Sequence, residues 1–308
     1  MIVASSEDEL PALQRLYRRG LANGVPGLER IGPRRLGELE PHARGVAAIH
    51  SPTTGIISFR AVAQKCAEIL IARGKRIWTG AQVVGLSVNA SSGGGCRVQT
   101  SRGVLESRLV INCAGLFSDR IAAWTGIAVR ARIVPFRGEY YRIRPEKRYL
   151  VRNLIYPVPD PRFPFLGAHF TRRIDGEIEA GPNAVLALAR EGYRPTDLRL
   201  ADLGPMLAYP GFWKMARRYW RTGLGELYRS FVKPAFVRDL RRLVPAIECS
   251  DLIRGGSGVR AQAVDERGSL LDDFEIARSG GAIHVLNAPS PAATSAFAIA
   301  ERILELAR

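Results

Sequence analysis

The sequence contains no apolar run of the roughly 20 residues that a membrane-spanning helix needs. Its first residues, MIVASSEDEL, have neither the basic segment nor the long apolar segment of a secretory signal peptide. Nothing in the pattern points to export or to membrane insertion. We therefore expect a cytoplasmic protein, with peripheral contact to the inner membrane as the alternative.

Cysteine and histidine are scarce, with four of each in 308 residues. The cysteines form no CxxC pair, and the histidines lack the spacing of metal ligands. We therefore expect reduced cysteines, no disulfide framework and no metal site. These residues are Cys66, Cys96, Cys113, Cys249, His42, His50, His169 and His284.

Lysine is also rare, with only five among the 45 basic residues, although the formal net charge is +16. A nucleic-acid-binding protein would concentrate its basic residues on one face or in a tail, whereas these arginines occur in every segment. We expect no nucleic-acid partner, and a basic nucleic-acid-binding protein is a distant alternative. An anionic substrate or an anionic membrane surface explains the charge equally well.

The length and the 46% hydrophobic content indicate about two globular domains. Helical and strand patterns are mixed at both ends of the chain, whereas residues 130–253 alternate as antiparallel strands do. A hairpin is expected there, with its turn at Asp175-Gly176. The sequence thus predicts an α/β (α+β) protein with domains built from interleaved segments: 1–128 and 253–308 in one domain, 129–252 in the other.

Two segments have the pattern strand, small-residue corner, helix. RLVINCAG (108–115) reads as a strand buried on both faces that ends at Ala114-Gly115 before a helix. The segment from Ala282 passes through a tight turn into the closing helix, which Ser290 can cap and whose first turn suits Pro291. Such corners bring the backbone close to a ligand. A core strand with a tight turn, and an ordinary capped helix, are the alternatives.

The segment GFWKMARRYWRTG predicts an amphipathic helix. Aromatic and apolar residues fall on one side of it and basic residues on the other. Such a helix can lie on an anionic membrane, although it more often packs on its own domain. The apolar side is expected to hold Phe212, Trp213, Met215, Ala216, Tyr219 and Trp220.

Several segments together resemble the FAD-dependent L-2-hydroxyglutarate oxidases and dehydrogenases, within the D-amino-acid-oxidase-like flavoproteins. They are VINCAGLFSDRIA, IVPFRGEYYRI, LIYPVPDPRFPFLGAHFTR, GVRAQAVD and HVLNAPSPAAT. The resemblance implies a Rossmann-like FAD/NAD(P)-binding domain interleaved with an antiparallel-sheet substrate domain. It also implies FAD as cofactor, a 2-hydroxy dicarboxylate as substrate, and oxygen or a membrane quinone as electron acceptor.

One feature of the family is missing from this sequence. The family opens with a βαβ unit that carries GxGxxG for the FAD pyrophosphate. Here SSGGGC precedes no helix, and GGSGVR lies late in the chain. We therefore expect an incomplete Rossmann-like domain, arising from a late start codon or a true truncation. The alternative function is a truncated, non-catalytic remnant that does not retain FAD.

The resemblance also implies site residues. In related flavoproteins the N-terminus of the closing helix faces the flavin edge on which negative charge develops on reduction, as the helix dipole favours. The residues implied to bind FAD are Ala114, Gly115, Gly258, Asn287, Ser290, Pro291, Ala292, Ala293 and Thr294.

Oxidation of a 2-hydroxy acid needs a base for the hydroxyl proton and a cation for the carboxylate. His169 in GAHFTR is the candidate base, because it titrates near neutral pH; a histidine satisfied within the sheet is the alternative. Arg260 stands where relatives place a carboxylate-binding arginine. A second carboxylate would need Arg137 or Arg172. Tyr140 is expected to line the pocket, since alternation sends only one of two adjacent tyrosines inward.

Overall fold

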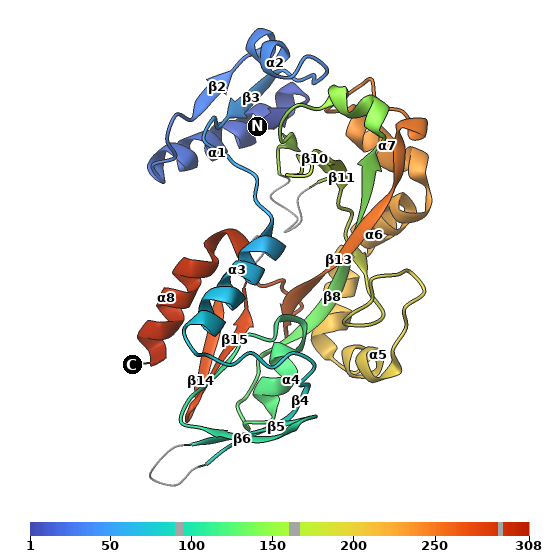
Figure 1. Ribbon diagram of the computed structural model, residues 1–308. Coiled ribbons are helices and arrows are strands. Elements are labelled where there is room, and N and C mark those ends of the chain that lie inside the picture. The colour runs from blue at the N-terminus through green and yellow to red at the C-terminus, as the bar shows by residue number, and fades with distance from the viewer. Residues whose placement is uncertain (90–94, 160–166, 289–291, 308) are drawn as a thin grey trace. The chain divides into compact units, whose positions relative to one another are not determined.

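The computed structural model describes residues 1–89, 95–159, 167–288 and 292–307. The chain divides into two units (Figure 1). Unit 1 comprises Met1–Ser58, Arg137–Val185 and Arg221–Gly258; unit 2 comprises Phe59–Phe136, Leu186–Trp220 and Val259–Arg308. Residues 1–58 group with the antiparallel block instead of with residues 59–128, which differs from the expected division. The units are nevertheless interleaved along the chain.

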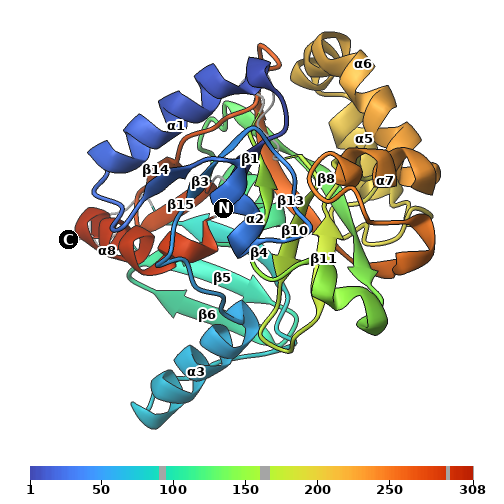
Figure 2. The same cartoon turned by 90° about the horizontal axis from the view of Figure 1, so that it is seen from above.

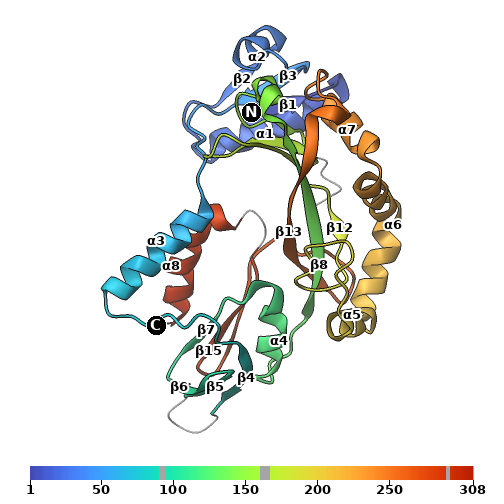
Figure 3. The same ribbon diagram turned by 45° about the vertical axis from the view of Figure 1, so that its right-hand side comes forward.

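Three long elements contribute residues to both units, and Figure 3 shows two of them, β8 and β13, running alongside each other. Strand β8 pairs with β13. The chain therefore passes from one unit to the other within regular structure at these places. The three elements are β8 (Ala131–Ile143), α6 (Pro210–Phe231) and β13 (Leu252–Asp265).

The first sheet of unit 1 has the strand order β2-β3-β1-β9. Helix α1 (Leu10–Ala22) packs against β1 and β3 and buries Leu13 completely (Figure 2). Helix α2 (Pro33–Leu39) begins at a proline, whose missing N–H is no loss in the first helical turn. The strands are β1 (Ile2–Ala4), β2 (Glu29–Ile31), β3 (Ala47–His50) and β9 (Tyr156–Pro157).

The second sheet of unit 1 contains the expected hairpin, β10 (His169–Arg172) and β11 (Ile178–Gly181), followed in order by β8 and β12 (Val185–Leu186). Arg173 N donates to Glu177 O across the turn at Asp175-Gly176, which confirms the predicted turn. Helix α7 (Lys233–Arg241) covers one face of this sheet. The core between them includes Tyr141, Phe170, Ala180, Phe236 and Leu240.

Unit 2 contains two three-stranded sheets, ordered β4-β5-β6 and β14-β15-β7. The first strand of unit 2 begins at Val83. The strands are β4 (Val83–Val88), β5 (Cys96–Thr100), β6 (Gly103–Ser107), β7 (Val110–Asn112), β14 (Glu275–Ser279) and β15 (Ala282–Asn287). The helices are α3 (Phe59–Ala72), α4 (Ser118–Ala123), α5 (Leu200–Leu207) and α8 (Ala296–Ala307).

Short 3-10 turns connect several of these elements. Two of them follow strands of unit 2, where the sequence predicts the small-residue corners. The 3-10 turns are η1 (Glu7–Glu9), η2 (Gly115–Phe117), η3 (Pro145–Leu150), η4 (Cys249–Asp251) and η5 (Ala293–Ser295).

Strand β7 is shorter and less buried than its apolar sequence predicts. Asn112 is buried, but Ile111 is 39% exposed. Because β7 is at the edge of its sheet, only β15 pairs with it among the described residues. The expectation of a strand buried on both faces was therefore wrong for β7, whereas the residues of the neighbouring β15 are all buried.

Helix α6 buries only part of its expected apolar side. Phe212 and Met215 are buried and Tyr219 packs against the same cluster, because residues three or four apart share a helix face. Trp213 and Trp220, seven residues apart, share a neighbouring face and are 57% and 54% exposed. The expectation that all the aromatic residues lie on one side was wrong. No helix in the described part of the chain is long and apolar enough to cross a membrane.

Candidate active site

The two strand–corner–helix segments end at the same sheet edge. Strands β7 and β15 lie side by side (Figure 3) and pair in parallel. Val110 is opposite Ala282, and Asn112 is opposite His284. Among the described residues, the next elements after each strand are a 3-10 turn and then a helix. In open α/β sheets, ligands bind in the crevice outside the carboxyl ends of parallel strands. This edge is therefore the place in unit 2 where a cofactor would approach the backbone.

The corner after β7 is held by side chains at both of its ends. Asn112 Oδ1 accepts the Ala114 backbone N–H at 3.1 Å. Ser118 Oγ, at the start of α4, donates to Leu286 O of β15 at 3.4 Å. Between these points, Gly115 has a φ of +53°, a conformation that side chains disfavour, and a Cβ there would meet nothing within 4 Å. The corner thus presents bare backbone to open space.

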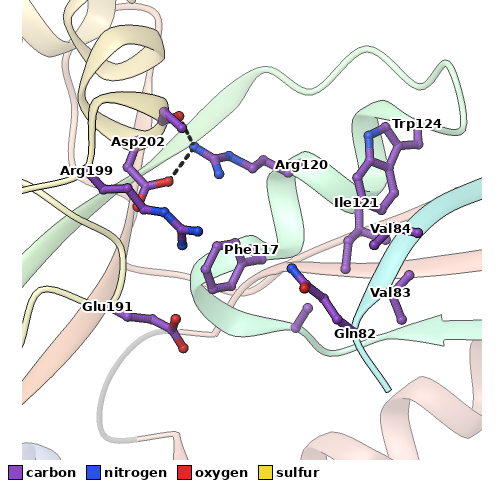
Figure 4. A pocket seen from close by; sticks show the side chains of 12 residues that line it. Gln82, Val83, Val84, Phe117, Arg120, Ile121, Trp124, Glu191, Arg199 and Asp202 are labelled. Atoms are coloured by element: carbon purple, nitrogen blue, oxygen red, sulfur yellow. Dashed lines mark hydrogen bonds and ion pairs between the residues drawn. The ribbon is translucent and has the colours of Figure 1, made fainter. Parts of the chain in front are cut away.

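A cavity of about 810 Å³ adjoins this corner, because Ala114 is one of its lining residues. Figure 4 shows Arg120 extending from α4 toward Asp202, with Phe117 in the middle of the view and Gln82 on the neighbouring segment. Arg120 pairs with Asp202 at 2.8 Å and lies 5.9 Å from the Phe117 ring centroid. The cavity therefore combines an aromatic wall with an arginine whose charge is already balanced.

A buried ion pair supports the same corner from behind. Asp119 and Arg190 have side-chain exposures of 2% and 8%, and Arg190 Nη2 donates to Asp119 Oδ2 at 2.9 Å. Arg190 also donates to Leu116 O in η2, and Asp119 Oδ2 accepts the Ile133 N–H at 3.0 Å. This network joins η2, α4 and β8 within unit 2, so it fixes the position of the corner.

The residues expected to hold FAD are only partly brought together. Ala114 and Gly115 form the corner after β7, and Asn287 ends the adjacent strand β15. Asn287 is buried, and its amide donates to Asp273 O at 2.7 Å, so it fixes the neighbouring loop. Gly258 belongs to unit 1.

The closing helix is described from residue 292 onward. Its first described turn is η5, with Ala292 at the N-cap, Ala293 and Thr294 within the turn, and no side-chain cap. Ser290 and Pro291 lie outside the described residues, so their predicted capping roles stay predictions. The open space at Gly115 and the paired carboxyl ends of β7 and β15 fit a cofactor that packs against bare backbone.

Unit 1 places His169 and Tyr140 on one face of its second sheet. His169 pairs with Gly181, and the register of β11 with β8 brings Gly181 beside Tyr140. A Cβ on Gly181 would lie 2.8 Å from Glu139 O and 3.1 Å from Tyr140 Cδ1. The glycine between them therefore has no room for a side chain. Tyr141 points to the other face and into the core, so the predicted alternation is confirmed.

His169 has the geometry of a neutral base. Its Nδ1 lies 2.9 Å from Gly167 O, and because a carbonyl oxygen only accepts, Nδ1 carries the proton and Nε2 carries the lone pair. The ring packs against Tyr156 at 4.4 Å between centroids. Burial lowers the pKa of His169 below its ordinary value, and the hydrogen bond to Gly167 only partly opposes this. Burial therefore favours the neutral form of His169.

The three candidate arginines have different surroundings. Arg137 is buried, and its Nε donates to Glu139 Oε1 at 3.0 Å, so it has a carboxylate partner within unit 1. Arg172 is exposed and lies three residues from His169 on β10, so alternation directs the two side chains to opposite faces. Arg260 is half-buried on β13 in unit 2. Their roles with substrate stay predictions.

The sequence reasoning did not single out Asn112, Thr125 or His284. These three residues form a buried hydrogen-bonded group behind the corner at Ala114. The only sequence signal was a polar asparagine at the end of an apolar run. In the described part of the chain, no group of three or more His, Cys, Asp or Glu side chains is arranged to hold a metal ion.

Comparison with known proteins agrees with this geometry. Residues 1–306 match the family model of the FAD dependent oxidoreductases. The L-2-hydroxyglutarate dehydrogenase of Indibacter alkaliphilus is 49% identical over 308 residues, covering 100% of this chain and 76% of that protein. The mitochondrial L-2-hydroxyglutarate dehydrogenase of Caenorhabditis elegans is 45% identical, covering 98% of this chain and 72% of that protein.

A solved structure confirms the expected fold class. The L-alpha-glycerophosphate oxidase of Mycoplasma pneumoniae, solved with FAD bound, superimposes with a TM-score of 0.71 at 19% identity. The alignment covers 99% of this chain and 71% of that one. At this identity the likeness establishes a shared fold. With the family model matched over nearly every residue, the chain belongs to the family of FAD-dependent oxidoreductases.

Proposed function

We propose that this protein oxidises L-2-hydroxyglutarate to 2-oxoglutarate with FAD as the hydride acceptor. The observation that carries the proposal is the 49% identity to an L-2-hydroxyglutarate dehydrogenase along the whole chain. The neutral His169 on the sheet face of unit 1 supplies the chemical group that the reaction needs.

The reaction removes a hydride from C2 and a proton from the 2-hydroxyl group, and the C–O single bond becomes a carbonyl. FAD, when bound, supplies the two-electron acceptor for the hydride. In the proposed mechanism His169 Nε2 accepts the hydroxyl proton. Nε2 is the nitrogen with the lone pair, because Nδ1 carries the ring proton and donates it in a hydrogen bond to Gly167 O. Tyr140, on the same sheet face, bounds the space beside the base.

The substrate carboxylates need fixed cations. Arg260 is proposed to bind the 1-carboxylate, because its planar guanidinium can donate two parallel hydrogen bonds. The second carboxylate is left to Arg137 or Arg172: Arg137 already has Glu139 as a partner, and Arg172 points to the sheet face opposite His169. Ala114 and Gly115 are proposed to hold FAD through their backbone, beside Asn287 and the turn formed by Ala292–Thr294.

The test is the visible absorption spectrum of the purified chain before and after anaerobic addition of L-2-hydroxyglutarate. We expect a flavin spectrum that bleaches with the L enantiomer and stays unchanged with the D enantiomer. A coloured protein that does not bleach would contradict the substrate. A protein that stays colourless after added FAD would favour the alternative, a chain that does not retain the cofactor.

The electron acceptor is proposed to be a membrane quinone, reached through contact of α6 with an anionic membrane surface; oxygen is the alternative. This helix exposes Trp213, Leu224, Leu227 and Phe231 by 57%, 57%, 45% and 68%. The exposed residues Arg217 and Arg218 lie on the same helix, and the net charge of +16 favours anionic lipid.

Flotation with vesicles tests this contact. We expect the protein to float with vesicles that contain anionic phospholipid, and to do so less at high salt. With neutral vesicles it should remain unbound at the bottom of the gradient. The double substitution Leu224→Gln and Phe231→Gln should abolish flotation, whereas Leu304→Gln, on the exposed face of α8, should not. Equal flotation of the double variant would remove α6 from the contact.

A further inference from the structure

His284 is a buried, titratable residue that the proposed mechanism does not use. It lies in the middle of β15, between β14 and β7, and it is 0% exposed. Both ring nitrogens have partners: Nδ1 lies 3.1 Å from Asn112 Nδ2, and Nε2 lies 3.2 Å from Thr125 Oγ1.

The direction of each hydrogen bond in this group follows from its neighbours. The Ala114 backbone N–H can only donate, so the atom of Asn112 that faces it is the oxygen Oδ1. Asn112 Nδ2 then donates one hydrogen to Ser118 O at 2.9 Å and the other to His284 Nδ1. His284 Nδ1 is therefore the unprotonated nitrogen.

The other side of the ring agrees with this assignment. Thr125 Oγ1 uses its single hydrogen to donate to Ala122 O at 2.7 Å. It can then only accept from His284, so His284 Nε2 carries the proton. Every donor and acceptor in the group is matched in one arrangement, and that arrangement requires the neutral ring.

We propose that His284 is a positioning residue for the cofactor-binding corner. Through Asn112 it holds the Ala114 amide, and it thereby fixes the backbone of Ala114-Gly115 against which FAD would lie. Without an acceptor at Nδ1, the Asn112 amide would lose one of the three hydrogen bonds that set its orientation. The proposal rests on the proposed function, because it takes this corner as part of the FAD site.

Protonation of His284 would break the arrangement. A proton on Nδ1 would face the Nδ2 hydrogens of Asn112, two donors with no acceptor, so the amide would have to turn and release Ala114. Burial lowers the pKa of His284, with no charged neighbour as a cause. The contribution is therefore complete above the ordinary pKa of about 6.5 and is lost as the pH falls through the lowered value.

The charged side chains on the neighbouring elements have partners elsewhere. On α4, Asp119 pairs with Arg190, and Arg120 pairs with Asp202. On β14, Arg278 donates to Gly280 O and Leu306 O. The remaining charged residue of β14, Glu275, is opposite Asn287 at the end of the strand. On the corner after β7, Cys113 is an exposed free cysteine.

Two substitutions separate positioning from simple packing. His284→Asn places an amide oxygen where Nδ1 stood, so it keeps an acceptor for Asn112. His284→Leu introduces an apolar side chain of similar size and removes the acceptor. We expect amide hydrogen exchange at Ala114 to become about tenfold faster or more in H284L, because a buried donor is left unpaired, and to stay near the wild-type rate in H284N.

FAD binding gives the second readout, by fluorescence titration with FAD against pH. The wild type should bind FAD more weakly as the pH falls through the lowered His284 pKa, and H284N should lose that dependence. H284L should bind about tenfold more weakly at pH 8. Equal Ala114 exchange in the wild type and H284L would overturn the proposal. If wild-type protein binds no FAD, the proposed function fails, while the exchange data still decide the role of His284.

Nitrogen NMR of the wild type needs no variant and covers the case in which H284L does not fold. With labelled histidine, the neutral His284 ring is expected to show Nε2 as the protonated nitrogen and Nδ1 as the unprotonated one. A proton on Nδ1 would remove the acceptor from the group and overturn the proposal.

Discussion

His169 in unit 1 and His284 in unit 2 are both kept neutral by burial, yet their surroundings differ in one decisive respect. His169 uses Nδ1 on Gly167 O, and among the described residues Nε2 has no hydrogen-bond partner. His284 has both nitrogens engaged within the core, on Asn112 and Thr125. A lowered pKa alone therefore does not identify a catalytic histidine. The two rings differ in the hydrogen-bonding capacity that remains among the described residues, and this difference supports the proposal that His169 acts as the base.

The same contrast extends to the residues around each ring. The row that contains His169 has Gly181 beside it and Tyr140 on the next strand. Behind the corner in unit 2, amides, a hydroxyl group and an ion pair are matched to one another. We therefore expect substitutions in the first region to reduce the rate, and substitutions in the second to reduce stability.

The largest effect is expected at His169. His169→Asn keeps a donor for Gly167 O, because the asparagine amide can replace Nδ1, but it removes the base at Nε2. Loss of a general base costs roughly 10²–10⁴ in kcat, whereas the free energy of unfolding should change by about 1 kcal/mol or less. Anaerobic stopped-flow measurement of flavin reduction, together with thermal unfolding, separates the two effects.

The control for this variant is His42→Asn, because His42 also contacts an aromatic ring, Tyr149, in unit 1. It should leave the reduction rate unchanged. The wild-type rate should also fall as the pH drops through the lowered pKa of His169, since only the neutral ring accepts a proton. A reduction rate for H169N within a factor of three of wild type would remove His169 as the base.

Sequence reasoning identified the elements at both regions but not the relation between them. The corner at Ala114-Gly115 and the strand Ala282–Leu286 are visible as local patterns of apolar and small residues. Their parallel pairing joins Asn112 to His284, 172 residues along the chain, and no local pattern encodes that register. The buried group behind the corner was missed for this reason.

The arginines show the same limit of sequence reasoning: the sequence suggests candidate ligands but does not reveal which of them already have partners in the folded chain. With 45 basic residues in the chain, the sequence could name Arg137 only as one of two candidate ligands for a second carboxylate. The partner that occupies its Nε is Glu139, two residues away on β8, whose carboxylate also accepts from Ser230 and Asn183. These bonds outweigh burial and hold the pKa of Glu139 below its usual range. Only the folded chain brings Ser230 to that strand.

At Asp119 we expect a smaller effect on the rate of flavin reduction than at His169, and a larger effect on the free energy of unfolding. Asp119→Asn removes the negative charge and leaves the Arg190 guanidinium, with 8% side-chain exposure, without its carboxylate partner. Breaking a buried ion pair by removing one partner typically costs about 3–5 kcal/mol. Urea unfolding of the apoprotein should show that loss, with the slope against urea unchanged if the folded state stays compact.

Glu305→Gln is the matched control for Asp119→Asn, because Glu305 pairs with Arg302 on α8 at 2.6 Å but both side chains are more than 60% exposed, at 61% and 67%. An exposed pair contributes about 0–1 kcal/mol, so this variant should unfold near the wild-type midpoint. The rate of flavin reduction in D119N, measured well below its unfolding midpoint, should fall far less than in H169N. If D119N instead lost the rate and kept the stability, the network behind the corner would take part in the chemistry, and the contrast between the two regions would fail.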